Sequence, residues 1–230
     1  MSTVLITGAN RGIGLELTRC YIDQGNTVIA CCRSPVQADD LRQIKDQADE
    51  RVNIHELDVT DAKSIEALKT SLGPMVIDTL INNAGIIGPE NQSTWNMDYD
   101  GFLETLNINT LSPLRMLQAF LTSLKASDNP KAITISSKMG SFTSLATDRV
   151  AYRTSKAAVN RLMFAAATDL KPDNIIIATM HPGWVTTDMG GPNADITPPV
   201  SAAGIIKVID GLTIDNTGDF FQWDGSQIKW

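Results

Sequence analysis

The sequence predicts an α/β fold in which seven parallel strands form one doubly wound sheet with helices on both faces. Apolar strand-like runs alternate with segments of helical periodicity along the whole chain, and a glycine-rich turn joins the first strand to the first helix. Such alternation is typical of a parallel sheet covered by helices. The strand runs lie at 3–7, 27–32, 52–56, 77–82, 131–136, 174–180 and about 218–222, and the helical segments at about 12–24, 36–48, 61–72, 98–126, 150–170 and 200–211.

Length and composition are sufficient for one hydrophobic core, because 43% of the 230 residues are hydrophobic. No linker divides the chain, so we expect a single domain over residues 1–230. Nineteen basic and 26 acidic residues give a net charge of −7 without a basic cluster, which argues against a nucleic-acid partner. No apolar run reaches the roughly 20 residues that a membrane span needs. The first strand begins almost at Met1, so we expect no signal peptide.

Cysteine and histidine usage predicts neither disulfides nor a metal site. Cys20 stands alone, and the adjacent Cys31 and Cys32 lie on a strand run with side chains on opposite faces. A reducing, cytoplasmic location fits this pattern. His55 and His181 have no partners at metal-ligand spacing, so we expect no metal.

The glycine-rich turn predicts a dinucleotide-binding site. Gly8 allows a sharp exit from the first strand, and Gly12 and Gly14 let the backbone and the following helix approach closely. The helix N-terminus then presents free N–H groups and a positive dipole end to a pyrophosphate. An ordinary glycine-rich turn is the alternative.

Candidate site residues also follow the other strand runs. Asp58, Asn83, Ser137 and Pro182 each stand at or just beyond the end of a run. Ligands of open parallel sheets bind outside the carboxyl ends of the strands, so we expect these residues and Gly8 on one edge.

Tyr152 and Lys156 are the candidate reacting pair. Their spacing of four places them on one face of the helix predicted at 150–170, one turn apart. A phenol titrates near pH ~10, and an adjacent cation favours its ionised form, which would bring proton exchange closer to neutrality. The alternative is a chance surface pair.

Together these motifs resemble the short-chain dehydrogenase/reductase family. The glycine spacing is G-x-x-x-G-x-G, and the resemblance covers nearly the whole chain. It implies a Rossmann fold and a nicotinamide dinucleotide cofactor. Segments 181–194 and 220–230 are similar to the C-factor and sniffer-like carbonyl reductase branch. The implied cofactor contacts are Gly8, Asn10, Arg11, Gly12, Ile13, Gly14, Arg33, Asp58, Val59, Asn83, Ala84, Gly85, Tyr152, Lys156, Pro182, Gly183, Val185 and Thr187.

The sequence favours NADPH over NADH. Where NAD-using relatives have an aspartate after the second strand, this chain has Cys32 followed by Arg33. Arg11 would lie on the same side of the adenosine. Two guanidinium groups with no nearby aspartate suit a 2′-phosphate. The alternative is that both arginines are solvated surface charges.

The resemblance implies carbonyl reduction by a catalytic set of Asn109, Ser137, Tyr152 and Lys156. Tyr152 would give its proton to the carbonyl oxygen, and Ser137 would hydrogen-bond that oxygen. Lys156 would bind the nicotinamide ribose and lower the pKa of the tyrosine. Ser136 competes with Ser137 for the serine role and is assigned to structure.

Pro113 gives Asn109 a local physical context. Because proline has no N–H, it cannot bond to the carbonyl of residue 109. We therefore expect the helix to kink and to leave this carbonyl free to hold a water. In the family, a water at this asparagine links the catalytic lysine to solvent.

The predicted substrate-binding residues are Ser137, Met139, Phe142, Tyr152 and Trp184, with core packing the alternative for Trp184. Little room for a helical lid exists between Asp188 and the helix near Pro199. An open pocket implies a range of aldehydes, ketones or dicarbonyls.

Three alternative functions remain. A reductase of 3-oxoacyl thioesters would need basic residues for a phosphate, and the loops at 140–149 and 188–198 offer only Arg149. A C-factor-like signalling protein could bind the dinucleotide with little turnover. A purely structural domain would not need the glycine turn. The sequence leaves both a homodimer and a monomer open.

Overall fold

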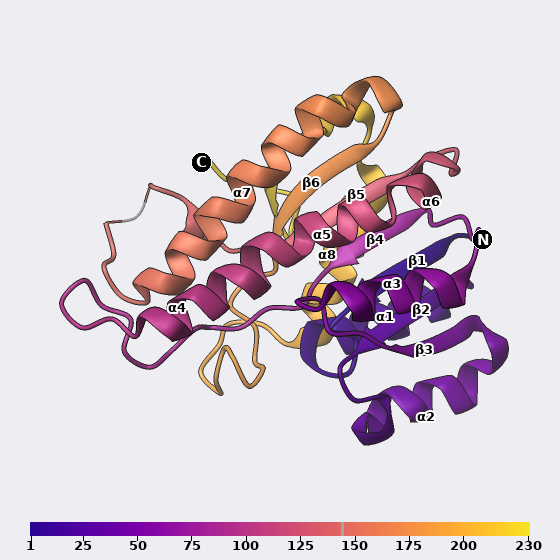
Figure 1. The fold of residues 1–230 in the computed structure, drawn as a ribbon, viewed down its shortest axis with the longest axis horizontal. Helices are drawn as coiled ribbons and strands as arrows, with labels where there is room; N and C mark the ends of the chain where they lie inside the picture. Colours follow the sequence, from indigo (N-terminus) through magenta and orange to yellow (C-terminus); the bar gives the residue numbers. More distant parts are fainter. Residues whose placement is uncertain (144) are drawn as a thin grey trace.

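Seven parallel strands form a single sheet in the order β3-β2-β1-β4-β5-β6-β7. The structure, a computed structural model, describes residues 1–143 and 145–230 (Figure 1). The order reverses between β1 and β4, which makes this point the switch point of a doubly wound sheet. The strands are β1 Thr3–Thr7, β2 Thr27–Cys32, β3 Val52–Glu56, β4 Thr79–Asn82, β5 Lys131–Ile135, β6 Ile176–His181 and β7 Phe220–Gln222.

Helices cover both faces of this sheet and enclose two apolar clusters (Figure 1). One cluster includes Leu17 and Ile205, from α1 and α8, and the other includes Met116 and Val159, from α5 and α7. The predicted fold class is thereby confirmed. The α-helices are α1 Gly12–Asp23, α2 Asp39–Ala48, α3 Ala62–Leu72, α4 Tyr99–Leu106, α5 Ser112–Ala119, α6 Leu121–Lys125, α7 Val150–Leu170 and α8 Pro198–Gly211.

The helix expected over 98–126 is divided into several parts. A π-helical segment, Asn107–Leu111, separates α4 from α5, and Phe120 leaves helical geometry between α5 and α6. The N–H of Ser112 bonds to the carbonyl of Asn107, five residues earlier. The wide turn directly precedes Pro113, whose missing N–H prevents regular α-helical bonding.

Three strands begin later than the apolar runs predicted, and β7, which begins at Phe220, is one of them. The N–H of Ile77 donates to the carbonyl of Ser123 on α6, so β4 begins only at Thr79. Asn174 adopts a left-handed conformation (φ 62°), and β6 begins two residues later. Apolar character alone therefore overestimates the length of the hydrogen-bonded ladder.

The parallel arrangement brings the carboxyl ends of β1, β4, β5 and β6 to one edge, where the candidate site lies. Among residues 1–143 and 145–230, no helix is both long and apolar enough to cross a bilayer. The same residues contain no group of three or more histidine, cysteine or acidic side chains placed to hold a metal ion.

Candidate active site

A cleft of about 800 Å³ opens at this edge of the sheet. Its lining combines the glycine turn with the ends of β2, β4, β5 and β6 and with the start of α7. The predicted site residues that line it are Gly8, Asn10, Arg11, Gly12, Ile13, Arg33, Asp58, Val59, Asn83, Ala84, Gly85, Tyr152, Lys156, Pro182 and Thr187. The sequence did not single out Gln37, Thr60, Ile86, Glu104, Thr186 and Asp188, which line it too.

The geometry of the glycine turn fits a dinucleotide pyrophosphate. Gly8 (φ 66°) and Gly12 (φ 54°) take conformations that favour glycine. A Cβ atom on Gly14 would lie 2.2 Å from the carbonyl oxygen of Gly8, so only glycine fits there. Within the described residues, the side chain of Arg11 does not cap α1. The first N–H groups of this helix thus remain available to an anion.

Asn83 ties the ends of β1 and β4 together. Its Nδ2 donates to the carbonyls of Thr7 and Gly8, both at 3.0 Å. In return, Thr7 Oγ1 accepts the N–H groups of Asn83 (3.0 Å) and Ala84 (3.1 Å). These bonds fix the floor of the cleft, so the Asn83 side chain has a structural role here.

The expectation that no aspartate lies near Arg11 and Arg33 is wrong. The guanidinium of Arg11 forms an ion pair with Asp188, on the loop after β6. The charge of Arg33 acts on Asp58, whose pKa is lowered mainly by hydrogen bonds from Thr60 and also by this arginine. The first contact could not be found from the sequence, since its partners are 177 positions apart. Arg33 and Arg11 both line the cleft, Arg33 beside Cys32.

Tyr152 and Lys156 project from the first two turns of α7, with relative exposures of 7% and 5%. The ammonium of Lys156 lies 5.7 Å from the centroid of the tyrosine ring. Its Nζ donates to the carbonyl of Ile135 at 2.8 Å. Burial lowers the pKa of Lys156 to about 8, which suits a group that exchanges protons near neutral pH. The predicted pair is thus brought together on the wall of the cleft.

The expected lowering of the Tyr152 pKa by Lys156 is not found. Burial raises this pKa, and a hydrogen bond with Ser137 and the charge of Arg149 oppose the rise. The physical reason is desolvation, which disfavours the phenolate. In this structure, Ser137 and Arg149 stabilise the ionised tyrosine.

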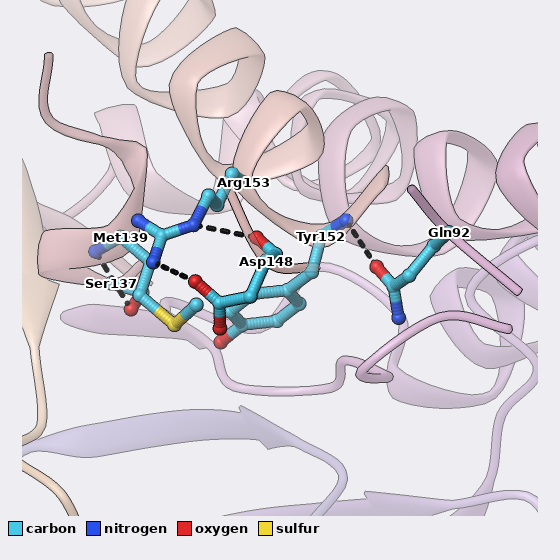
Figure 2. Close-up of polar contacts among 6 residues, drawn as sticks. All are labelled: Gln92, Ser137, Met139, Asp148, Tyr152 and Arg153. Carbon is cyan, nitrogen blue, oxygen red and sulfur yellow. Dashed lines mark hydrogen bonds and ion pairs between the residues drawn. The ribbon is translucent and has the colours of Figure 1, made fainter. Parts of the chain in front are cut away.

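Ser137 and Ser136 differ in what their hydroxyl groups contact. Ser137, the second residue after β5, hydrogen-bonds with Tyr152. Its Oγ accepts the N–H of Met139 at 3.1 Å (Figure 2). The hydroxyl of Ser136 instead donates to Asn160 of α7, 2.5 Å away. Ser136 lines the cleft and Ser137 does not, although Ser137 is the serine that contacts Tyr152, so the assignment of Ser137 to the site and of Ser136 to structure stays a prediction.

Asn109 lies within the π-helical segment and connects it to the chain after β4. Its Oδ1 accepts the N–H of Ile86 (2.9 Å), and its Nδ2 donates to the Ile86 carbonyl (2.8 Å) and to Ser155 Oγ (3.0 Å). A wide turn replaces the kink that we expected from Pro113. That the Asn109 carbonyl binds a water stays a prediction.

The structure does not bring the other predicted substrate residues into the cleft lining. Met139 is half-buried, whereas Phe142 and Trp184 are 85% and 47% exposed. Trp184 donates its Nε1–H to the carbonyl of Gly190 at 2.8 Å, so it is not packed in the core. Gly14, Asn109, Ser137, Gly183 and Val185 also lie outside the lining residues that the structure describes. Residues 184–197, all described, contain no helical lid.

Comparison with known proteins gives this site a family context. The family profile for short chain dehydrogenase matches residues 2–196. The chain is 38% identical to C-signal from Myxococcus xanthus, over 72% of this chain and all of that protein. It superposes on the NADPH-bound carbonyl reductase from chicken fatty liver with a TM-score of 0.94 and 34% identity, covering 100% and 99% of the two chains. The carbonyl reductase Sniffer of D. melanogaster gives a TM-score of 0.94 and 30% identity over both full chains.

The family match spans the glycine turn and the Ser137, Tyr152 and Lys156 positions, and it agrees with the fold and the cleft. The chain therefore belongs to the short-chain dehydrogenase/reductase family of oxidoreductases, in the branch that includes the carbonyl reductases and C-signal.

Proposed function

We propose that this protein reduces the carbonyl groups of small aldehydes, ketones and dicarbonyls to alcohols, with NADPH in preference to NADH. The observation that supports this most directly is the buried Tyr152–Lys156 pair on the wall of the cleft, with Ser137 hydrogen-bonded to the tyrosine. The NADPH-bound state of the chicken carbonyl reductase supports the choice of cofactor. Arg33 in the lining supports it as well, since a guanidinium suits a 2′-phosphate.

Each residue of the site then has a distinct role. The glycine turn and the start of α1 hold the dinucleotide, which when bound supplies the hydride. Tyr152 donates its phenolic proton to the carbonyl oxygen of the substrate, and Ser137 hydrogen-bonds that oxygen. Lys156 holds a proton near the tyrosine, and its pKa of about 8 allows exchange close to neutral pH. Burial of the pair excludes water from the reacting atoms.

The test is turnover of a carbonyl panel, followed by NADPH absorbance, for the natural chain and for Tyr152→Phe. We expect the phenylalanine variant to lose at least about 1,000-fold in kcat because the proton donor is gone, while NADPH still binds. Tyr99→Phe is the matched control, because Tyr99 is 74% exposed on α4 and outside the cleft. Carbonyl reduction by Tyr152→Phe at the natural rate would contradict the proposal.

The similarity to C-signal favours one second candidate, a signalling protein that binds the dinucleotide with little or no turnover. The same panel separates the two functions. NADPH binding without reduction of any substrate would support the signalling role. The panel also contains a 3-oxoacyl thioester, and a reductase specific for that class would reduce this compound alone.

A further inference from the structure

Gln92 lies outside the cleft, yet it contacts the main chain of the catalytic tyrosine. It belongs to the segment between β4 and α4 and is 8% exposed. Its Oε1 accepts the N–H of Tyr152 at 3.1 Å (Figure 2). The backbone carbonyl of Gln92 accepts the N–H of Val150 at 2.9 Å. One residue thus holds two N–H groups of the first turn of α7.

These contacts matter because α7 has no cap of its own. Arg149, at the N-cap, has a left-handed conformation (φ 51°), and its side chain makes no capping bond within the described residues. The first N–H groups of a helix lack intrahelical partners and usually receive a cap from the preceding residue. Here the cap comes from Gln92, 60 positions before Tyr152.

Both the oxygen and the nitrogen of the Gln92 amide form hydrogen bonds, which explains why glutamine suits the position. While Oε1 accepts from Tyr152, Nε2 donates to the carbonyls of Ile87 (3.1 Å) and Pro89 (2.7 Å). An amide can accept and donate at once, whereas a carboxylate only accepts and a thioether does neither well. Gly88 packs against this amide, since a Cβ atom on Gly88 would lie 3.4 Å from both Nε2 and Oε1 of Gln92.

The carbonyl of Tyr152 is held from the opposite side. Ser155 Oγ donates to it at 2.7 Å and accepts from Asn109 Nδ2 at 3.0 Å. Asn109 in turn binds both backbone groups of Ile86. The segment 86–92 is therefore tied to the Tyr152 backbone at both ends, by Asn109 through Ser155 and by Gln92 directly.

We propose that Gln92 is a positioning residue for Tyr152, and that its amide fixes the tyrosine backbone so that the phenol meets the carbonyl oxygen of the substrate. The inference rests on the proposed role of Tyr152 as proton donor. Gln92 itself touches neither substrate nor cofactor, and loss of its amide moves the phenol without removing it.

Gln92→Met is the first test, because methionine has a similar length but no comparable donor or acceptor. Misplacement of a reacting group by about 1 Å can cost about 100-fold in rate, so we expect kcat to fall about 10- to 100-fold. The Kd of NADPH, from fluorescence titration, should stay within about twofold. Ser93→Ala is the matched control: it removes the bonds of Ser93 to Asn96 in the same segment without touching α7, and kcat should stay within about twofold.

Gln92→Glu tests for rescue. A carboxylate keeps the acceptor for the Tyr152 N–H and is favoured at a helix N-terminus, but it cannot donate to Ile87 and Pro89. We expect kcat to recover to within about threefold of the natural chain. A residue that served only to hold the loop would show no such recovery.

Four results would overturn the inference: kcat of a folded Gln92→Met within twofold of the natural chain, an equal loss in Ser93→Ala, a matching loss of NADPH affinity, or no recovery in Gln92→Glu. If Gln92→Met does not fold, Gln92→Asn replaces it, because its amide is one methylene shorter. If neither folds, the role is structural and the inference is wrong. Activity in Tyr152→Phe would refute the proposed function, whereas loss there with a fully active Gln92→Met refutes the positioning role alone.

Discussion

The glycine turn lines the cleft with closely packed main-chain atoms, whereas the loop after β5, where the sequence predicts substrate contacts, carries exposed side chains outside the cleft lining that the structure describes. A Cβ on Gly14 would lie 2.2 Å from the carbonyl of Gly8 and 2.5 Å from Asn83 Nδ2. On the loop after β5, by contrast, Phe142 and Leu145 are 85% and 96% exposed. Because main-chain atoms pack directly against each other at this turn, the turn cannot shift to accommodate a larger group. Exposed side chains can change rotamer at little cost, so we expect cofactor binding to be strict and substrate choice to be broad.

Gly14→Ala tests the glycine turn, and we expect it to have the largest effect on NADPH binding. The added methyl must displace either the Gly8 carbonyl or α1, which should reduce the free energy of unfolding by about 2–3 kcal/mol. The Kd of NADPH should rise at least about 100-fold, because the helix N-terminus would leave the pyrophosphate site. Urea denaturation and fluorescence titration measure the two effects.

Gly211→Ala is the control for this substitution. Gly211 ends α8, and a Cβ there meets nothing within 4 Å. Both stability and NADPH affinity should remain close to those of the natural chain. If Gly14→Ala bound NADPH as tightly as Gly211→Ala does, the glycine turn would not be strict and the comparison would fail.

Lys156→Met should raise stability while it abolishes turnover. Burial lowers the pKa of Lys156 from 10.5 to about 8. Below pH 8 the lysine is charged in both states, so the whole cost of burying the charge opposes folding. Between pH 8 and 10.5 the unfolded chain binds a proton that the folded chain has lost, and stability rises with pH.

The methionine variant should therefore be more stable by about 3 kcal/mol at pH 7, and this difference should vanish by about pH 10.5. Urea denaturation across this range measures it. Lys207→Met on α8 is an exposed control that should change stability by less than about 0.5 kcal/mol. Equal stability of the Lys156→Met and natural chains at pH 7 would show that burial of the Lys156 charge does not reduce the free energy of unfolding.

The parts of the molecule that short-range physics determines could be predicted from the sequence. Period-2 and period-3.6 patterns gave the order of the elements, and parallel pairing brought Asp58, Asn83 and Tyr152 to one edge. The glycine turn was predictable because its sterics admit no other residue type at Gly14. Tyr152 and Lys156 were found because their spacing and their helix are both local features.

Long-range side-chain contacts could not be predicted. Arg11 meets Asp188 only because the loop after β6 returns to the glycine turn, and Gln92 meets Tyr152 only because the segment after β4 crosses the start of α7. Burial reversed the expected shift in the Tyr152 pKa, and desolvation depends on the packed structure. An isolated glutamine in a polar segment has no local pattern that marks it as a helix cap.

Arg33→Asp tests the part of the cleft that we expect to bind the adenosine. Its effect should be smaller than the effects of Gly14→Ala and Lys156→Met. A carboxylate there would repel a 2′-phosphate and accept hydrogen bonds from ribose hydroxyls. We expect kcat/KM with NADPH to fall about 10- to 100-fold and kcat/KM with NADH to rise. Arg42→Asp on α2, whose side chain pairs with Asp39 outside the cleft lining, is the control. An unchanged cofactor ratio would indicate that Arg33 is only a solvated charge.

Phe142→Ala should have the smallest effect, because its ring is 85% exposed. Stability should change by less than about 0.5 kcal/mol. We expect kcat/KM for aromatic aldehydes to fall by no more than about threefold, since such a ring offers only a partial apolar contact, and kcat/KM for small aliphatic carbonyls to stay the same. Steady-state kinetics on both classes measure this. A loss above tenfold on every substrate would mean that Phe142 closes over the cleft during turnover, and the loop after β5 would then be as strict as the glycine turn.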